Sequence, residues 1–420
     1  MVGAVLGGGV YACAAISSTT GSLQVTISPA AATNGGAQWQ VDGGAWKNSG
    51  AMVTNLPVGN HTVSFRGIDY WGAPANQTVS IKAKSVVKVT GTYTFNAQGI
   101  YNGLFAQADT NVESAGMLNG LVVTASGTYG GKLLMGGSTN TISGGFNGSG
   151  QASNYVQRAA KQGGALTLAM WVNWNDAPLN IAGTVSGTNG GDWVANLTAE
   201  LAAKAPASAD FTAWLLPAGT PPGFGYLLLT NHAGAVTLSG ALADGTSFSQ
   251  AMPVSGNGDL PVYGNLYGST GLLTGWIGLE SGSPTGTLTW IKPASRSSAL
   301  YTNGFTNRVV LQGSVWTNPL AHAAIDLPAG QLNISGGSLV SNLTFNVAVN
   351  NTNGLVKLGK IPTNSLTGAI NPKTGLWTIT FGNGAGKATT AGAGAVLQNV
   401  NSAGGFFLGK TNAGSILLQP

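Results

Sequence analysis

Alternating apolar and polar residues predict short β-strands along most of this chain. Residues 23–27 (LQVTI), 77–81 (QTVSI) and 86–90 (VVKVT) alternate with a period of two, which places successive side chains on opposite faces of a strand. Asp42-Gly43, between two further apolar runs, is a favoured hairpin turn. About seven short strands lie between residues 22 and 95 with turn residues at each break, and this pattern describes a small β-sandwich.

The same segment carries a set of residues that resembles a known module. The matching residues are Trp39, 41–44 (VDGG), Trp46, 56–59 (LPVG), 61–63 (HTV) and Trp71. Together they resemble the PEGA-like, immunoglobulin-type modules that repeat in large surface proteins of Verrucomicrobia and related bacteria. This resemblance implies a spacer or presentation domain rather than a catalyst. His61 lies in a strand of that pattern and is interpreted as structural, a polar residue on a half-buried strand.

Residues 96–420 predict one large glycine-rich β domain. Glycine inside a strand marks strong curvature or a close approach of backbones. A short glycine-centred unit recurs at 142–146 (ISGGF), 238–242 (LSGAL), 273–277 (LTGWI) and 366–370 (LTGAI). The longer segments 120–193 and 225–290 also resemble each other. We therefore expect an internal duplication of antiparallel meanders, barrel-like or as one twisted sheet.

The large domain contains one predicted helix and one predicted seam. Residues 196–204 (NLTAELAAK) predict two helical turns with Asn196 as the cap. Proline and glycine near 205–223 indicate a seam between the two halves. The predicted fold class is therefore all-β: a small Ig-like β-sandwich at 22–95, then a large Gly-rich antiparallel β domain with internal duplication at 96–420.

The C-terminal part of the chain carries a second resemblance. Segments 290–293 (WIKP), 301–307 (YTNGFTN) and 405–420 are similar to uncharacterised C-terminal domains of the same bacterial surface proteins. The similarity implies secretion and a β fold. It supplies no catalytic residues.

Residues 1–21 form an apolar N-terminal segment. Ala12-Cys13-Ala14 fits a signal-peptide cleavage site and 10–13 loosely resemble a lipoprotein box, but no Lys or Arg precedes the apolar stretch. We therefore expect an uncleaved segment that packs as a strand, at an edge of its own domain or in a sheet of a neighbouring subunit. The candidate inter-subunit strand residues are Val2, Val5, Leu6, Val10, Tyr11 and Ile16.

Composition narrows the class of protein. Of 420 residues, 66 are glycine, 7% are charged and 43% are hydrophobic, whereas a typical soluble domain is about 25% charged and about 7% glycine. Disorder needs low hydrophobicity, coiled coils need Glu/Lys/Leu-rich heptads, and collagen needs a three-residue glycine period. What remains is a β protein with a polar but uncharged surface.

The distribution of charge argues against nucleic acid as a partner. The net charge of +5 reflects 12 acidic against 17 basic residues. The densest basic group, Lys82, Lys84 and Lys88, is predicted to share one solvated strand face rather than to track phosphates. No run of about 18 apolar residues is present, so no transmembrane helix is expected.

No residue pattern in the sequence predicts a catalytic, cofactor or metal site. The single cysteine, Cys13, excludes intramolecular disulfides and cysteine-based zinc sites, and the three histidines are widely separated. No G-x-S-x-G elbow precedes a helix. Asp42, Asp244 and Asp259 adjoin glycine, where turn formation is the interpretation. We therefore expect no enzyme activity and no cofactor.

Three tryptophans are the candidate glycan contacts. Trp171, Trp174 and Trp193 lie near Asn and Asp residues, as the stacking side chains of carbohydrate-binding modules do. The three-residue spacing of Trp171 and Trp174 places them on opposite faces of a regular strand, which favours core packing instead.

Together these features predict a non-catalytic, secreted structural protein of the bacterial cell surface. The most specific version of this prediction is a self-assembling filament subunit. Its copies form a homopolymer in which the N-terminal segment of one copy completes a sheet in the next. The alternatives are a glycan-binding surface adhesin and an outer-membrane barrel with an outward apolar band.

Overall fold

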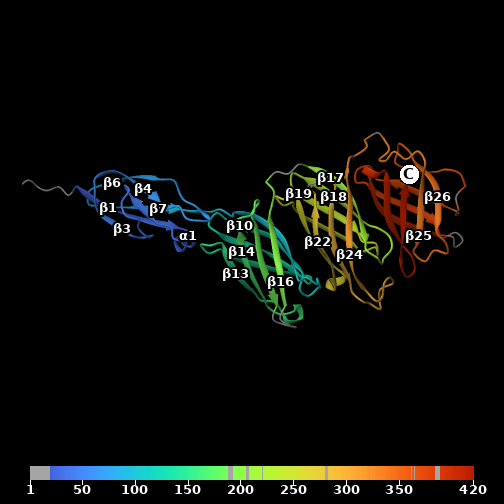
Figure 1. Cartoon of the computed structure of the whole chain (residues 1–420), viewed down its shortest axis with the longest axis horizontal. Coiled ribbons are helices and arrows are strands. Elements are labelled where there is room, and N and C mark those ends of the chain that lie inside the picture. Colours follow the sequence, from blue (N-terminus) through green and yellow to red (C-terminus); the bar gives the residue numbers. More distant parts are fainter. Residues whose placement is uncertain are drawn as a thin grey trace, which may run out of the picture. The chain divides into compact units, whose positions relative to one another are not determined.

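The computed structural model (Figure 1) describes residues 19–187, 193–204, 208–219, 221–279, 282–320, 322–360, 362–363, 365–383 and 388–420. Nearly every element in these ranges is a β-strand, so the predicted all-β fold is confirmed. The chain divides into two compact units. The first unit runs to Ala97 and includes Thr124–Gly127 and Phe146–Gly150, and the second unit holds the remaining residues up to Pro420.

The first unit contains two three-stranded sheets, β3-β1-β7 and β2-β4-β6, and a two-stranded pair, β5-β8. Its elements are β1 (Thr20–Ser28), α1 (Ala30–Asn34), β2 (Trp39–Val41), β3 (Met52–Pro57), β4 (Gly59–Phe65), β5 (Trp71–Gly72), β6 (Gln77–Ile81), β7 (Val86–Thr92) and β8 (Thr94–Phe95).

The core of the first unit lies between its two three-stranded sheets. Leu23, Val25 and Ile27 are buried on one face of β1 because they alternate with less buried neighbours. The other sheet supplies Phe65, whose ring lies so close to Gly91 of β7 that a Cβ atom at this glycine would be 2.0 Å from the ring Cε1. The two sheets therefore share one core, as the alternation predicts.

The lysines of the first unit are arranged differently from the prediction. Lys82 and Lys84 lie between β6 and β7, with Lys84 at a φ of 58°, and Lys88 lies on β7. The prediction that the three lysines share one strand face is therefore wrong, because a turn interrupts the alternation between them.

The second unit contains three eight-stranded antiparallel sheets, each nearly closed into a barrel. Barrel A comprises β9 (Gly99–Ala106), β10 (Gly116–Val123), β11 (Thr128–Met135), β12 (Ser138–Gly145), β13 (Gln151–Val156), β14 (Leu166–Asn173), β15 (Asn180–Gly187) and β16 (Trp193–Leu201). Barrel B comprises β17 (Ala209–Pro217), β18 (Gly225–His232), β19 (Ala235–Ala241), β20 (Ser247–Pro253), β21 (Asp259–Leu266), β22 (Gly271–Gly278), β23 (Thr285–Lys292) and β24 (Phe305–Trp316).

Barrel C comprises β25 (Gly330–Gly336), β26 (Leu343–Val349), β27 (Leu355–Lys357), β28 (Leu366–Ile370), β29 (Leu376–Gly382), β30 (Thr389–Leu397), β31 (Ser402–Leu408) and β32 (Ala413–Gln419). Short 3-10 helices η1 (Ala160–Gln162), η2 (Tyr267–Ser269) and η3 (Gln398–Val400) lie in the connections. Within the described ranges, no helix is long and apolar enough to cross a membrane.

The three barrels repeat one topology. In each, consecutive strands pair as a meander and the first strand pairs with the last, β9 with β16, β17 with β24, and β25 with β32. The two end strands of each sheet are consecutive in the chain, namely β12 and β13, β20 and β21, and β27 and β28. Where the sequence predicts an internal duplication, the structure therefore contains three repeats.

Side chains and single backbone bonds join the end strands of each barrel. In barrel B, the Gln250 amide of β20 donates to Pro261 O at 2.7 Å and accepts from Tyr263 N at 2.8 Å, both on β21. In barrel A, Asn154 Nδ2 donates to Ser143 O at 2.8 Å. In barrel C, Ile370 N of β28 donates at 2.9 Å to Asn353 O, in the turn just before β27. These bonds occupy strand edges that would otherwise present unpaired backbone groups.

Glycine is required where neighbouring strands of a barrel approach most closely. A Cβ atom would lie 2.0 Å from a backbone oxygen at Gly103 in barrel A, Gly240 in barrel B and Gly394 in barrel C. Backbones that approach this closely leave no room for a side chain, and the strong coiling of a small barrel brings such approaches about. The high glycine content is therefore explained in part by barrel closure.

The predicted helix at 196–204 is wrong. Residues 196–201 belong to β16, in which Ala195, Leu197 and Ala199 are buried and the intervening Asn196 and Thr198 are exposed, and residues 202–204 follow the strand without forming a helix. This two-residue period fits pairing on both sides, with β9 and with β15. Pairing and burial override the helix propensity of the alanines and leucines.

Candidate functional site

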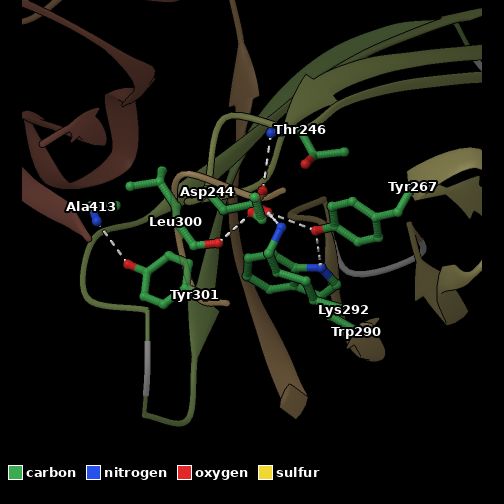
Figure 2. A network of polar contacts seen from close by, with 9 residues as sticks. Asp244, Thr246, Tyr267, Trp290, Lys292, Leu300, Tyr301 and Ala413 are labelled. Atoms are coloured by element: carbon green, nitrogen blue, oxygen red, sulfur yellow. Dashed lines mark hydrogen bonds and ion pairs between the residues drawn. The ribbon is translucent and has the colours of Figure 1, made fainter. Parts of the chain in front are cut away.

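A buried ion pair lies in barrel B (Figure 2). Lys292 Nζ, at the end of β23, is 3.0 Å from Asp244 Oδ2, in the turn between β19 and β20. The side chains are 8% and 1% exposed, respectively. Two charges so deeply removed from water are stable together only if their remaining hydrogen-bonding capacity is also satisfied.

Neighbouring groups satisfy the remaining hydrogen-bonding capacity of Asp244. Tyr267 of η2 donates its hydroxyl proton to Asp244 Oδ2 at 2.7 Å, and Thr246 N donates to Oδ1 at 3.0 Å. Trp290 Nε1 donates in turn to the Tyr267 hydroxyl at 2.9 Å. Lys292 Nζ also lies 4.2 Å from the centre of the Tyr267 ring, a cation–π contact. Burial, reinforced by the negative Asp244, raises the pKa of Tyr267 far above 10, so this tyrosine is a neutral donor.

This network holds the fold of barrel B together. It ties a turn, a 3-10 helix and the end of a strand to one carboxylate, and each donor already has a partner within the protein. The loop after β23 continues it toward barrel C, where Ala413 N donates to the Tyr301 hydroxyl at 2.8 Å (Figure 2). The sequence-based interpretation of Asp244 as a turn residue is therefore incomplete, because Lys292, 48 positions away, is its ion-pair partner.

A second ion pair fixes the first unit. His61 of β4 is 8% exposed, its Nδ1 lies 2.5 Å from Asp42 Oδ2, and its Nε2 lies 2.9 Å from Pro57 O. Both ring nitrogens face acceptors, so the arrangement is fully satisfied only when both carry protons. Asp42 is held at the hairpin turn by Thr62 N, which donates to Oδ1 at 2.8 Å. His61 is thus part of the structural framework that its strand pattern indicates.

The His61–Asp42 pair is expected to make the first unit most stable between about pH 4 and pH 6.5. The hydrogen bond with Asp42, followed by that with Pro57, raises the pKa of His61 above 6.5. The hydrogen bond from Thr62 N, followed by that from His61, lowers the pKa of Asp42 below 3.8. The histidine contribution is therefore full below 6.5 and is lost as pH rises through the raised pKa; the aspartate contribution is lost as pH falls through the lowered one.

The measurement is the thermal stability of the first unit within the full-length protein at each pH, with hydrogen exchange of residues 19–97 as the readout. We expect a change of at most about 1 kcal/mol, because the Asp42 side chain is 48% exposed and solvent screens the pair. Asp42→Asn keeps a residue that tolerates the positive φ of 49° at this position. It should flatten the pH dependence, and a profile unchanged by Asp42→Asn would contradict the assignment.

The three candidate glycan-binding tryptophans are spread over barrel A. Trp171, 40% exposed on β14, pairs with Ala182, whereas Trp193, half-buried at the start of β16, pairs with Gly187 at the other end of β15. Trp174 lies in the turn after β14, outside the regular strand. The three side chains therefore do not form one continuous platform.

Trp193 instead lines a pocket that the sequence does not predict. The cavity is about 440 Å³, and Met135, Arg158, Lys161 and Glu113 also contribute to its wall. Arg158 follows β13 and is buried, with 6% exposure. No motif surrounds this arginine in the sequence, and only the fold brings it to Trp193.

The candidate inter-subunit strand, Val2, Val5, Leu6, Val10, Tyr11 and Ile16, lies outside the described residues, as does Cys13. Across the described ranges, no group of three or more His, Cys, Asp or Glu side chains is placed to hold a metal ion.

No protein-family model matches the chain, and no curated protein matches it. Among solved structures, a double mutant of the vaccine antigen Transferrin Binding Protein B from Haemophilus parasuis is 11% identical. The match covers 84% of this chain and 83% of that one, with a TM-score of 0.20. A likeness of that size supports no functional argument.

Proposed function

We propose that this chain is a non-catalytic structural protein of the cell exterior, built from sealed barrels and assembled into filaments. The observation that carries the proposal is the repeat itself: three eight-stranded meanders, each nearly closed into a barrel by a few bonds between its two ends. Such units can be added one after another without exposing a sheet edge. The sparse charge of the chain is compatible with close packing between copies.

Direct contacts between successive barrels support a structural role. Trp214 of β17 in barrel B donates through Nε1 to Ala395 O of β30 in barrel C at 2.8 Å. Its ring lies over Gly404, where a Cβ atom would be 2.8 Å from Cε2. Barrels A and B are joined by backbone bonds, from Ala203 N to Val254 O at 2.9 Å and from Gly256 N to Leu201 O at 2.8 Å. The Trp214 contact is buried, as in a domain core, whereas the bonds between barrels A and B involve the half-buried Ala203 and the exposed Gly256.

The absence of catalysis is part of the proposal. In barrel B, the carboxylate of Asp244 is engaged by Tyr267 and Lys292, so these groups already have internal partners. A general acid or base must instead face a space that a substrate can enter.

The proposed assembly uses residues 2–16 of one copy as a strand in a sheet of the next. The barrels are poor acceptors, because their end strands are joined to each other. In the first unit, by contrast, β3 and β7 pair with β1 on one side only within the described part of the chain. These strands carry exposed apolar side chains, Met52 at 47% and Val86 at 50%. The edge of this sheet is therefore our proposed acceptor.

Deleting residues 2–16 is expected to convert filaments into folded monomers, because the deletion removes the added strand and leaves every described element intact. Negative-stain electron microscopy and size-exclusion chromatography measure the outcome. The control is Cys13→Ser, which keeps the apolar strand and removes the only thiol, and it should leave filaments unchanged. Filaments that persist after the deletion would contradict the proposed linkage.

Glycan binding is the second candidate function, and the positions of the tryptophans restrict where a sugar can bind. The exposed ring of Trp171 is isolated from Trp193, so a shared flat platform for a sugar chain is not formed. Trp193, however, lies in a pocket beside an arginine. Any sugar site we propose is therefore centred on Trp193.

A further inference from the structure

Arg158 is a buried cation without a carboxylate partner among the described residues. The side chain is 6% exposed. Its Nε donates to Gly164 O at 2.8 Å, and its Nη1 donates to Met135 Sδ at 3.4 Å. The two ion pairs formed within the described ranges, His61 with Asp42 and Lys292 with Asp244, do not involve it. A neutral carbonyl and a thioether are weak compensation for a buried positive charge.

The unpaired side of the guanidinium faces a pocket. Nη2 has no hydrogen-bond partner in the described part of the chain, and it lies next to the pocket residue Gly163, where a Cβ atom would be 3.2 Å away. The cavity, about 440 Å³, falls in the size range of small-molecule sites. Because Nε and Nη1 are anchored to Gly164 and Met135, the guanidinium is held in place before any ligand arrives.

The charges around this pocket favour an anion. Lys161 adds a second positive charge at its wall, and Glu113 adds one negative charge. Both of these side chains are exposed, so the solvent screens them, whereas the charge of Arg158 is buried. Burial lowers the pKa of Arg158 from 12.5, but an arginine remains protonated at neutral pH. An anion entering the pocket would therefore offset a charge that the protein leaves uncompensated.

The shape of the donors and the aromatic wall specify the ligand further. A guanidinium offers planar N–H groups that match a carboxylate better than a spherical anion. Trp193 provides a flat apolar surface, and its indole is fixed against Gly187, where a Cβ atom would lie 2.6 Å from Cε2. Glu113 can accept hydrogen bonds from hydroxyl groups. Carboxylate, ring face and hydroxyls together describe an acidic sugar.

We propose that this pocket, lined by barrel A and by Ser269 of barrel B, binds a carboxylate-bearing saccharide, with Arg158 holding the carboxylate and Trp193 packing on the sugar ring. The proposal goes beyond the structural role of the barrels and does not depend on filament assembly. A sealed barrel of a cell-exterior protein would thereby also carry a site for an acidic polysaccharide.

Isothermal titration of the full-length protein with glucuronate, glucose and acetate tests the proposal. Glucuronate should bind at least about tenfold more tightly than glucose, which lacks the carboxylate, or acetate, which lacks the ring. Arg158→Met should weaken glucuronate binding by about tenfold or more, and Trp171→Ala, outside the pocket, should leave it unchanged. Equal binding of glucose, no detectable binding of glucuronate, or sulfate binding as tight as glucuronate would overturn the assignment.

Two surface variants keep the test decisive if Arg158→Met fails to fold. Glu113 and Lys161 are exposed, so their replacement leaves the core intact. Glu113→Gln should tighten glucuronate binding by about threefold and Lys161→Met should weaken it by about threefold, because each changes the charge facing the ligand. Changes of the opposite sign, or none in either variant, would place the ligand elsewhere.

Discussion

Replacing Gly240 with alanine is expected to destabilise barrel B by about 3 kcal/mol or more. Gly240 lies on β19 beside β18, and the added Cβ atom would lie 2.0 Å from Tyr226 O and 2.9 Å from Leu227 Cδ2. The oxygen belongs to the backbone of a paired strand, so relief of the clash requires the two strands to separate. Hydrogen exchange of barrel B, read peptide by peptide, measures the loss without assuming that the whole chain unfolds in one step.

The matched control is Gly264→Ala on β21 of the same barrel. There a Cβ atom would meet Leu273 Cβ at 3.5 Å, an ordinary van der Waals contact. We expect a change within about 1 kcal/mol, because alanine also restricts the unfolded chain and this partly offsets any cost. If the two variants were equally stable, close backbone approach would not be the reason for glycine at position 240.

Replacing Lys292 with methionine is expected to cost about 3 to 5 kcal/mol, because Asp244 would then be buried without its counter-charge. Methionine matches the lysine stem in length, so packing against the Tyr267 ring is largely kept. The expected signature is a lower unfolding temperature of barrel B and faster hydrogen exchange in the turn at 242–246. Lys132→Met on β11, where the lysine is exposed, should change the stability little.

A second substitution separates the missing charge from the missing contacts. Adding Asp244→Asn to Lys292→Met removes the uncompensated charge, and an asparagine oxygen can still accept from Tyr267. The double variant should therefore be more stable than Lys292→Met alone. If it were less stable, the cost would come from lost packing and hydrogen bonds rather than from a buried charge.

The alternation of apolar residues predicts β1, β4 and β6 of the first unit, because buried and more exposed side chains alternate along these strands. It does not predict the short helix α1, and β3 is paired without having any buried residue. The pattern failed at 196–204, where small apolar residues with high helix propensity pair with β9 and β15. Propensity is a local property, whereas pairing depends on strands far away in the sequence.

The sequence pattern also did not predict the number of repeats. The glycine-centred unit falls on β12 and β28, the fourth strands of barrels A and C, and on β19 and β22, the third and sixth strands of barrel B. It marks tight strand geometry rather than an equivalent position, so counting it does not count barrels. The repeated feature is the topology, which tolerates different sequences.

The polar sites could be predicted only in part. Asp42 and Asp244 occupy turns beside glycine, as their sequence context indicates. Their partners are non-local: Lys292 is 48 positions from Asp244 and His61 is 19 positions from Asp42. Arg158 carries no local signal at all, because its significance comes from burial and from the approach of Trp193 in the folded barrel.

The junction between the end strands β20 and β21 of barrel B has a consequence for how such a protein evolves. One glutamine side chain, Gln250, takes the place of a backbone ladder between β20 and β21. Loss of that amide would leave Pro261 O and Tyr263 N of β21 without this partner, and natural sheets avoid such unpaired edges because they recruit other chains. A single substitution at position 250 would therefore expose the edge of β21 to pairing with another chain.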